Sequence, residues 1–416
     1  MKRTILVVTE LYPNVTNSFI GSFVVQQLEL LKRHFTIVVI TVHRIRLLKR
    51  RGKITLRQPY YRQEQGFHVY SIPHMPFWLE WPGYLLNRIS RRFTAFQFAV
   101  DKLLTTRRIL ALARELHAHY HFSIVHGHET YIGDEAASVG HQLNIPSVFT
   151  LHGLYPYHLQ GWGESVMRRA VANMNATDRL IAVSRLAAQS YMDQGVQRGF
   201  EIIPNGVRPP EREGRFHLPK EVMAFTRGKL VLLTVGFFVP EKRIGYSIRT
   251  LGRLRADGIR NVVLLLIGKG FLEPKLRKMI QEEKLTDAVR IVGEVPPKEM
   301  AGYYSITDVL VHPSVVESFS MVCLEAMSYG KPIVCTSAIG LTEFLKSGKN
   351  AIVVPPDDFN DLYRAVFKLV QNAPLRRTIG RQAQRVAQHL SWSRQVRKLR
   401  RIYEDAGSKQ EGTRRF

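Results

Sequence analysis

Short apolar runs rich in β-branched residues alternate with segments of helical period along most of the chain. The runs that predict strands are Ile5–Val8, Thr36–Ile40, Ile124–His126, Ser147–Leu151, Leu180–Val183, Glu201–Ile203, Leu230–Val235, Val262–Ile267, Val289–Val292, Val309–His312, Ile333–Cys335 and Ala351–Val354. Apolar strands separated by helices are typical of parallel sheets that are covered on both faces. Twelve strands would be unusual in one sheet, so the pattern predicts an α/β protein with two parallel sheets.

A stretch rich in proline, glycine and charge separates the two series of strands. It begins at Ile203 and reads IPNGVRPPEREGRFHLPKE, a composition typical of a linker. The predicted division of the chain is an N-terminal domain at 1–206, a linker at 207–228, a C-terminal domain at 229–388, a helical segment at about 389–405 and a tail at 406–416. The helical segment follows the last strand of the second domain and can pack back on the first domain.

Composition places the chain among globular proteins of a reducing compartment. Its 416 residues are 45% apolar and 23% charged, which suits two folded domains. The only cysteines, Cys323 and Cys335, provide no disulfide framework. The first apolar run has four residues, whereas a signal peptide needs roughly 7–15. The sequence contains no run of about eighteen apolar residues, so no membrane-spanning helix is predicted and we expect a cytoplasmic protein.

The charge of the chain is strongly basic. Sixty Lys and Arg residues against thirty-four Asp and Glu residues give a net charge of +26. Such a field attracts anions, among them nucleic acid, anionic lipid headgroups and nucleotide phosphates. The basic residues are spread over both predicted domains and form no recognised nucleic-acid-reading module. Nucleic acid is therefore an unfavoured partner, although a basic nucleic-acid-binding protein remains an alternative.

Two carboxylates stand eight residues apart in the segment VVESFSMVCLEAMSYGKPIV, at Glu317 and Glu325. Ser318 or Ser320 can cap a helix that runs to about Tyr329, and the free N–H groups at its start would accept an anion. Because acids repel phosphate, the two glutamates are expected to accept hydrogen bonds from neutral hydroxyls, such as the vicinal diols of a sugar and a ribose. On spacing alone, two exposed glutamates without a ligand would be the commoner interpretation.

The longer segment HPSVVESFSMVCLEAMSYGKPIV resembles the E-x7-E signature of glycosyltransferase family 4, which comprises retaining enzymes of the GT-B architecture. The resemblance is strongest over residues 230–370. Supporting segments are VGFFVPEKRIGYSI, LLLIGKGFLEPKL, VRIVGEVPPKEM, LHG, AVS and IPNGV. The resemblance implies two Rossmann-like parallel-sheet domains that face a central cleft.

The same resemblance implies a function. It predicts transfer of a sugar from a nucleotide-sugar donor to a glycan or lipid-linked acceptor, in the synthesis of a cell-envelope polysaccharide or glycolipid. A nucleotide-sugar epimerase of the same fold is the nearest alternative, and it would need acid and base carboxylates that are aimed at the sugar.

Three residues are implied to take part in the reaction. Glu317 would bind hydroxyls of the donor sugar, and Lys242 would contact the diphosphate as a point charge. His152, which follows a predicted strand, would lie near the transferred sugar, although a histidine in such a place is more often structural.

The other implied residues bind the donor. Glu325 would bind the ribose. The residues implied to contribute backbone groups or line the nucleotide are Gly21, Gly268, Gly270, Val295, Ser318, Phe319, Ser320 and Met321. Gly21 would let the backbone approach the donor phosphates closely.

The sequence departs from the family pattern at several positions. Phe237 stands where an arginine that pairs with Lys242 is common, so one diphosphate charge is missing. Ser318 and Ser320 replace glycines, and Arg208 stands where aspartate is frequent. Neither glutamate is lost, so the transferase interpretation is retained.

No metal or cofactor is expected. The chain has no convincing DxD motif, and the histidines of HAHYHFSIVHGH, at 117–128, lack the carboxylates or cysteines of a metal site. Solvated loop histidines and a core strand explain that segment sufficiently.

Two basic segments suggest a membrane surface. Residues 43–57 hold seven Lys or Arg and no acid. In the second segment, at 84–110, the apolar residues predicted to share one helical face are Leu85, Ile89, Phe93, Phe96, Val100 and Leu103. Such a helix can lie on the anionic inner face of the cytoplasmic membrane, or it can pack on its own domain with a solvated basic side, and we weigh the two equally.

Overall fold

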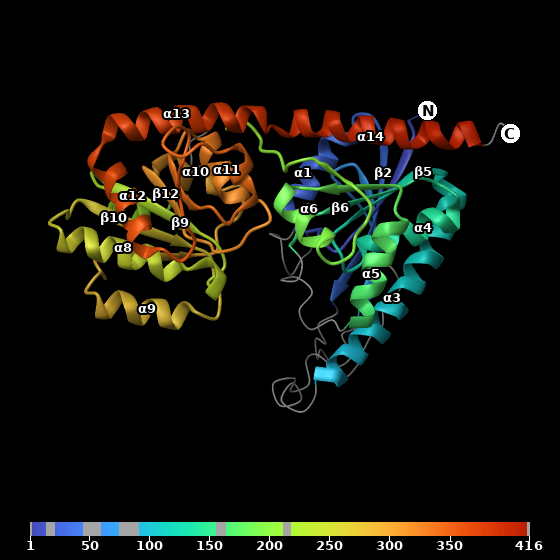
Figure 1. The fold of residues 1–416 in the computed structure, drawn as a ribbon, viewed down its shortest axis with the longest axis horizontal. Coiled ribbons are helices and arrows are strands. Elements are labelled where there is room, and N and C mark those ends of the chain that lie inside the picture. The colour runs from blue at the N-terminus through green and yellow to red at the C-terminus, as the bar shows by residue number, and fades with distance from the viewer. Residues whose placement is uncertain are drawn as a thin grey trace. The chain divides into compact units, whose positions relative to one another are not determined.

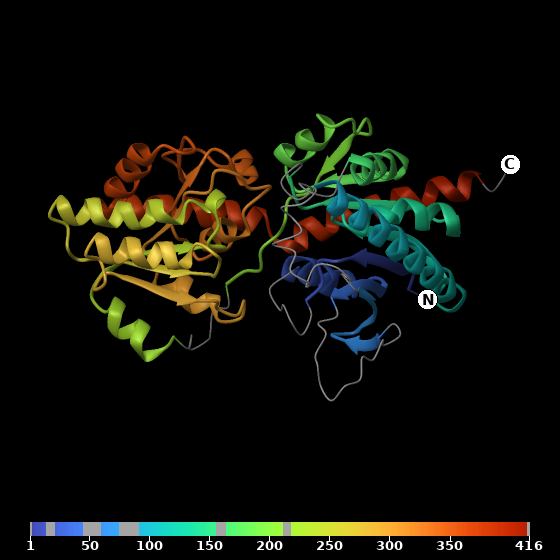
Figure 2. The same cartoon turned by 90° about the horizontal axis from the view of Figure 1, so that it is seen from below.

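A computed structural model describes residues 2–13, 21–44, 60–74, 91–154, 164–210 and 218–413. They form two compact units, each built around one sheet, which confirms the predicted α/β class with two parallel sheets (Figures 1 and 2). Unit 1 comprises Met1–Pro204 together with Gln395–Phe416, and unit 2 comprises Asn205–Arg394. We describe each unit by itself.

Unit 1 contains a mainly parallel sheet. Its elements are β1 (Thr4–Thr9), α1 (Ser22–Leu31), β2 (Thr36–Arg44), β3 (Tyr60–Glu64), β4 (Phe67–His74), α3 (Arg91–Tyr120), β5 (Phe122–His128), η1 (Gly133–Glu135), α4 (Ala136–Leu143), β6 (Ser147–Leu151), α5 (Glu164–Ala176), β7 (Arg179–Ala182), α6 (Arg185–Met192) and β8 (Phe200–Ile202). Within the described residues the strand order is β3-β4-β2-β1-β5-β6-β7-β8. Of these described strands, only β3 runs antiparallel to its neighbour.

The strands β3 and β4 form a hairpin that the apolar pattern does not predict. Their two-residue turn, Gln65-Gly66, has φ angles of 53° and 81°. Two positive φ values in a two-residue loop suit the right-handed twist of a hairpin. Strand β3 reads YYRQE and lies at the edge of the sheet. Because an edge strand can be polar, it lacks the apolar run from which strands were predicted.

The C-terminal helix α14 (Trp392–Thr413) belongs in part to the core of unit 1. The buried apolar residues that it adds to the cluster around β1 and β2 are Val396, Leu399, Ile402 and Tyr403. The helix continues beyond residue 405, where the sequence predicted a tail. The extension contains no proline, and Ala, Lys, Gln and Glu within it favour helix, which offsets its two glycines.

A buried cluster of charged residues joins α3 to the turn after β5. Nζ of Lys102 lies 2.6 Å from Oδ1 of Asp134 and 3.5 Å from Oε1 of Glu135. Asn173 of α5 donates to Oδ2 of Asp134 at 3.0 Å, and Arg169 lies 3.4 Å from Oε2 of Glu135. Burial raises the pKa of Asp134 to about 6, although Lys102 opposes the rise. The cluster therefore links α3, η1 and α5 through ion pairs and a hydrogen bond between side chains.

Unit 2 contains a parallel sheet. Its elements are α7 (Lys220–Thr226), β9 (Leu230–Val235), η2 (Pro240–Lys242), α8 (Ile244–Ala256), β10 (Val262–Ile267), α9 (Glu273–Glu282), β11 (Val289–Gly293), α10 (Met300–Ile306), β12 (Val309–His312), α11 (Met321–Ser328), β13 (Ile333–Thr336), η3 (Gly340–Phe344), β14 (Ile352–Val354), α12 (Phe359–Gln371) and α13 (Ala373–His389). Among the described strands the order is β11-β10-β9-β12-β13-β14, and every pair is parallel. Helix α7 lies within the segment predicted as a linker, and its Val222 is buried.

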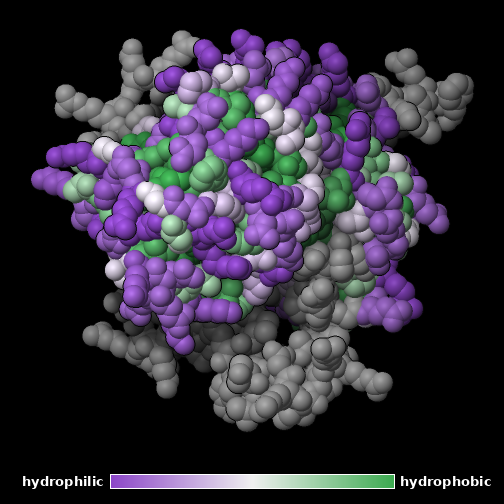
Figure 3. Space-filling model, turned by 60° about the vertical axis from the view of Figure 1, so that its left-hand side comes forward, coloured by the Kyte–Doolittle hydropathy of each residue, from purple (hydrophilic) through white to green (hydrophobic). Residues whose placement is uncertain are grey.

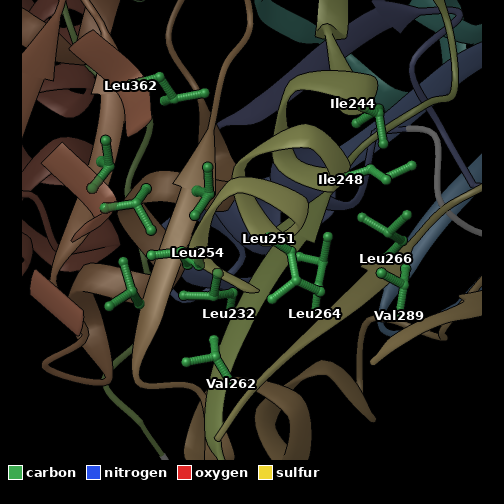
Figure 4. Packing of buried hydrophobic residues seen from close by; sticks show 14 of the residues in the cluster. Leu232, Ile244, Ile248, Leu251, Leu254, Val262, Leu264, Leu266, Val289 and Leu362 are labelled. Atoms are coloured by element: carbon green, nitrogen blue, oxygen red, sulfur yellow. The ribbon is translucent and has the colours of Figure 1, made fainter. Parts of the chain in front are cut away.

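The core of unit 2 forms where α8 packs on the sheet. Ile244, Ile248 and Leu251 follow one another at helical spacing and point toward apolar residues of β9 and β10, such as Leu232 and Leu264 (Figure 4). This spacing gives α8 one apolar face, and the burial of that face fixes the helix against the strands. The carboxyl ends of these strands, which carry the turns described below, are thereby fixed relative to α8.

One face of the molecule shows how hydrophilic and hydrophobic residues are distributed on it (Figure 3). On the face drawn in Figure 3, hydrophilic residues predominate, and hydrophobic ones show in smaller groups between them. Among the described residues, none of the helices combines the length and the apolar character that crossing a membrane would require.

Candidate functional site

Three turns follow neighbouring parallel strands of unit 2 and contact one another through their backbones. The N–H of Gly268 donates to the carbonyl of Gly293 at 2.8 Å. Gly268 has a φ of 137°, and a Cβ there would lie 1.9 Å from the carbonyl oxygen of Gly236. A Cβ on Gly270 would lie 2.4 Å from the carbonyl oxygen of Phe238. Both glycines are thus required for these turns to pack, and their predicted contact with a nucleotide remains a prediction.

The rim formed by these turns carries two exposed aromatic side chains. Phe237 is 56% exposed and Phe271 is 72% exposed. Nζ of Lys269 lies 2.6 Å from the carboxylate of Glu294, and Val295 beside it is buried. Ligands bind to open parallel sheets outside the carboxyl ends of the strands, so this rim lies where a ligand is expected.

The loop between β12 and α11 carries the first glutamate of the motif. The backbone N–H of Val315 donates to the carbonyl of Glu241 at 2.9 Å, and that of Glu317 donates to the carbonyl of Ala338 at 3.1 Å. Ser320 ends the loop and caps α11, because its hydroxyl accepts from the N–H of Cys323. The φ of Ser320 is 88°, in the left-handed region that favours glycine. The predicted serine cap is confirmed.

Glu317 lies between two basic side chains. Its Oε1 contacts Nζ of Lys242, and its Oε2 lies 2.8 Å from Nε2 of His312. Burial would raise the pKa of Glu317, but His312 and Lys242 outweigh it and hold the pKa well below its usual range. The structure therefore brings together two of the predicted catalytic residues, Glu317 and Lys242, and adds His312, which the sequence motif did not indicate.

His312 is the last residue of β12 and its ring is buried. Its Nε2 also lies 3.3 Å from the hydroxyl of Ser320. Burial alone would lower the pKa of His312, but Cys323 and the carboxylate of Glu317 oppose this, and the net result is a raised pKa. The residue pattern does not mark His312 as part of a site, and its distance from Glu317 is what identifies it.

Glu325 has a different environment. The phenolic hydroxyl of Tyr304, on α10, donates to Oε2 of Glu325 at 2.7 Å. Burial raises the pKa of Glu325, and the hydrogen bond from Tyr304 opposes only part of that rise. The two glutamates of the motif thus have different hydrogen-bond partners, one cationic and one neutral. Tyr304 was not identified from the sequence.

The remaining motif residues divide between core and loop. Phe319 is buried, and its ring centroid lies 6.5 Å from that of Phe344. Only backbone groups of Phe319 are therefore suited to a ligand, as its predicted role requires. Ser318 and Met321 are partly exposed on either side of Ser320.

Arg243 does not replace the arginine that is common in the family at position 237. Phe237 carries no charge, and Arg243, beside Lys242, binds Asp357 through two nitrogens, one of them at 2.8 Å. These hydrogen bonds raise the pKa of Arg243 and lower that of Asp357. Among the described residues, Lys242 is the lysine or arginine whose side chain contacts Glu317.

In unit 1, Gly21 and His152 lie at the same edge of the sheet. Gly21 precedes α1 with a φ of 72°, and a Cβ there would lie 1.9 Å from the carbonyl oxygen of Leu11. The ring of His152 lies 4.7 Å from that of Phe23, in the first turn of α1. Its Nε2 lies 3.0 Å from Nδ1 of His128, and burial lowers the pKa of both rings. The pair is therefore neutral near pH 7.

Another histidine connects unit 1 to the C-terminal helix. Nδ1 of His126 lies 2.6 Å from the hydroxyl of Tyr403, and its Nε2 lies 2.8 Å from the hydroxyl of Thr150. This histidine lies in β5, which confirms the predicted core strand. In the described parts of the chain, no three His, Cys, Asp or Glu side chains are arranged to hold a metal ion.

Glu10 was also not identified from the sequence. It follows β1, and its two carboxylate oxygens accept from the N–H groups of Tyr131 and Ile132, each at 3.2 Å. Burial and the neighbouring Glu129 raise the pKa of Glu10 to about 8. A protonatable carboxyl thus lies at the sheet edge that also carries His128.

Comparison with protein families covers both units. The family described as Glycosyltransferase Family 4 matches residues 28–210, and the family described as Glycosyl transferases group 1 matches residues 220–386. The chain is a family 4 glycosyltransferase. It is 28% identical over 287 residues to an uncharacterized glycosyltransferase of Methanocaldococcus jannaschii, a match that covers 68% of this chain and 75% of the relative.

Solved structures confirm the GT-B fold of this glycosyltransferase. Sucrose-phosphate synthase from Thermosynechococcus elongatus has a TM-score of 0.71 at 20% identity, with 98% of this chain and 100% of that chain covered. Anabaena HepE, solved in complex with UDP, has a TM-score of 0.68 at 15% identity, with 97% and 100% covered. In this glycosyltransferase the E-x7-E motif spans the loop after β12 and helix α11 of the C-terminal unit.

Proposed function

We propose that this glycosyltransferase transfers a sugar, with retention of anomeric configuration, from a nucleotide-sugar donor to a glycan or lipid-linked acceptor. The observation that supports it most is the group of Lys242, Glu317 and His312 beside the N-terminus of α11. It offers a cation and the positive end of a helix for a phosphate, and a carboxylate for hydroxyls. The complexes of HepE with UDP and UDP-glucose support a nucleotide-sugar donor.

Each group has a distinct chemical task. The ammonium of Lys242 and the N–H groups before α11 stabilise the negative charge that develops on the departing phosphate. Glu317 remains ionised and accepts hydrogen bonds from hydroxyls of the sugar. Glu325, which Tyr304 holds in place, accepts from the ribose. These tasks require no resident metal, because the positive charges come from the protein.

The first test is a screen of donors. Sugars linked to UDP, GDP, ADP and dTDP are incubated with the protein in the absence of acceptor, and release of nucleotide is measured. We expect slow hydrolysis of at least one donor. Absence of both hydrolysis and binding for all of them would overturn the proposed function.

A glutamine at position 325 is expected to weaken binding of the active nucleotide about tenfold, which corresponds to about 1.4 kcal/mol. Glutamine keeps an acceptor for Tyr304 but loses the charge that strengthens a hydrogen bond to the ribose. Calorimetry with the free nucleotide measures the change. Glu282→Gln, an exposed residue of α9, is the matched control and should bind as the wild type does. Unchanged affinity in Glu325→Gln would contradict the ribose assignment.

We further propose that the protein acts at the inner face of the cytoplasmic membrane in the synthesis of an envelope polysaccharide or glycolipid. Val100, Leu103 and Leu104 of α3 are between 40% and 48% exposed, and Arg107 and Arg108 on the same helix are exposed. Exposed apolar residues beside cations suit an anionic lipid surface. The residues 45–57, Leu85, Ile89 and the side chains of Phe93 and Phe96 lie outside the described part of the chain.

Vesicle binding tests this proposal. Replacing Arg107 and Arg108 by glutamine is expected to weaken binding to vesicles of mixed phosphatidylglycerol and phosphatidylcholine about 30-fold, at about 1 kcal/mol for each charge. The control, Lys275→Gln with Lys278→Gln on α9, removes the same charge from unit 2 and should have little effect. Equal binding to neutral vesicles, or binding that salt does not weaken, would contradict an electrostatic attachment.

A further inference from the structure

His312 is a side chain of the candidate site to which neither the motif nor the family resemblance assigns a role. Its Nε2 lies 2.8 Å from Oε2 of Glu317, while Lys242 contacts Oε1 of the same carboxylate. The two basic groups come from different elements, because Lys242 ends η2 and His312 ends β12. Glu317 is therefore held from both sides.

Under the proposed function, Lys242 interacts with two anions, the carboxylate of Glu317 and the phosphate of the donor. When a donor phosphate arrives, the ammonium of Lys242 turns toward it and its contact with Glu317 weakens. A partly buried carboxylate that loses a hydrogen-bond partner is destabilised, because the loss of its hydration is then no longer compensated. Glu317 then keeps its place only if a second partner remains, and His312 already provides one.

The charges around His312 favour this exchange, in which Lys242 leaves Glu317 for the donor phosphate and His312 remains the partner of Glu317. The titratable groups that act on its ring are Cys323 of α11, Glu317 of the loop and Lys242 of η2. Burial and Lys242 lower the pKa of His312, whereas Cys323 and Glu317 raise it. As Lys242 moves away, one influence against protonation is removed. The imidazole thus becomes easier to protonate at the moment when Glu317 loses its other cation.

The backbone of the loop does not depend on His312. The carbonyl of Glu317 accepts from Gly340 at 3.0 Å, and its N–H donates to Ala338 at 3.1 Å. Val315 is bonded to Glu241 in the same way. Loss of the imidazole should therefore affect the carboxylate of Glu317 and leave the path of the chain unchanged.

We propose that His312 is a positioning residue, which holds the carboxylate of Glu317 toward the donor sugar while Lys242 contacts the donor phosphate. The role of Lys242 rests on the proposed function. The contact between His312 and Glu317 does not, so the two can be tested separately.

A titration of the histidine rings tests the exchange directly. Nitrogen NMR on ¹⁵N-histidine-labelled protein follows His312, whose signal is assigned by its loss in His312→Gln. We expect the pKa of His312 to fall in Glu317→Gln and to rise when UDP is added to the wild type. In Lys242→Met the pKa should already be raised, and UDP should change it less.

The outcomes separate the two proposals. If UDP binds and the pKa of His312 stays constant, the exchange is wrong. If UDP, GDP, ADP and dTDP all fail to bind, the nucleotide-sugar function is overturned. In that case an unchanged pKa in Glu317→Gln would also overturn the coupling of His312 to Glu317.

Kinetics provide the second test. With the donor that the screen identifies, His312→Gln is expected to reduce kcat about 10- to 100-fold, as misplacement of a reacting group does, and to leave nucleotide affinity nearly unchanged. Because glutamine does not titrate, the decline of kcat above the pKa of His312 should disappear. His389→Gln, an exposed histidine that ends α13, is the matched control. An unchanged kcat, or an equal loss of nucleotide binding, would overturn the positioning role.

Discussion

Glutamine in place of Glu317 is expected to reduce transfer from the active donor about 10³-fold, the upper range for loss of one preorganised electrostatic group. Glutamine has nearly the size of glutamate but lacks the charge that pairs with both Lys242 and His312. Its amide nitrogen would face Lys242 or His312, and two donors cannot form a hydrogen bond with each other. The side chain would therefore turn away from the sugar. The ratio kcat/KM measures the loss.

The fold must be monitored in the same experiment. Circular dichroism should show the wild-type spectrum for Glu317→Gln, because the loop is held by backbone hydrogen bonds to Glu241 and Ala338. Glu282→Gln removes an exposed carboxylate on α9 and should retain full activity. Turnover within twofold of the wild type in Glu317→Gln would contradict the assignment of this residue to the reaction.

Methionine in place of Lys102 is expected to lower the free energy of unfolding of unit 1 by about 3–5 kcal/mol, the range for loss of one partner from a buried ion pair. Methionine fills most of the volume but leaves the carboxylates of Asp134 and Glu135 without their shared cation. Both carboxylates are buried, so water cannot replace the ammonium without opening the structure.

Hydrogen exchange of the amides in β1 and β5 measures this loss within unit 1. Asp134→Asn added to Lys102→Met should recover part of it, because one uncompensated charge is removed. Lys398→Met, on the exposed side of α14, is the control and should change stability by less than about 0.5 kcal/mol. A loss of that small size in Lys102→Met would show that the buried cluster contributes little.

The central strands of both sheets were predictable because they are buried on both faces. Strands such as Val262–Ile267 read as uninterrupted apolar runs, and the structure has these same bounds. The edge hairpin was not predictable in this way. Tyr60–Glu64 is polar, so it lacks an apolar pattern. The turn at Gln65-Gly66 is identified by its positive φ angles, which these residue types allow but do not require.

The candidate site was predictable only where a motif marks it. Glu317, Glu325 and Lys242 stand at positions to which the family motifs assign a role. His312 begins the same segment as Glu317 but has no assigned role, and Tyr304 comes from a neighbouring helix. Their contacts depend on how β12, α10 and α11 pack, which no local pattern encodes. The same holds for Glu10, whose environment includes backbone groups from residues more than a hundred positions away.

The position of α14 has a consequence for biosynthesis. Tyr403, which contacts His126, is translated after the whole of unit 2, although the strands that it covers are translated before that unit. The N-terminal sheet therefore emerges with part of its apolar side uncovered and is completed only after the whole second unit has been translated. A chain that stops before residue 396 would expose this surface to chaperones and proteases.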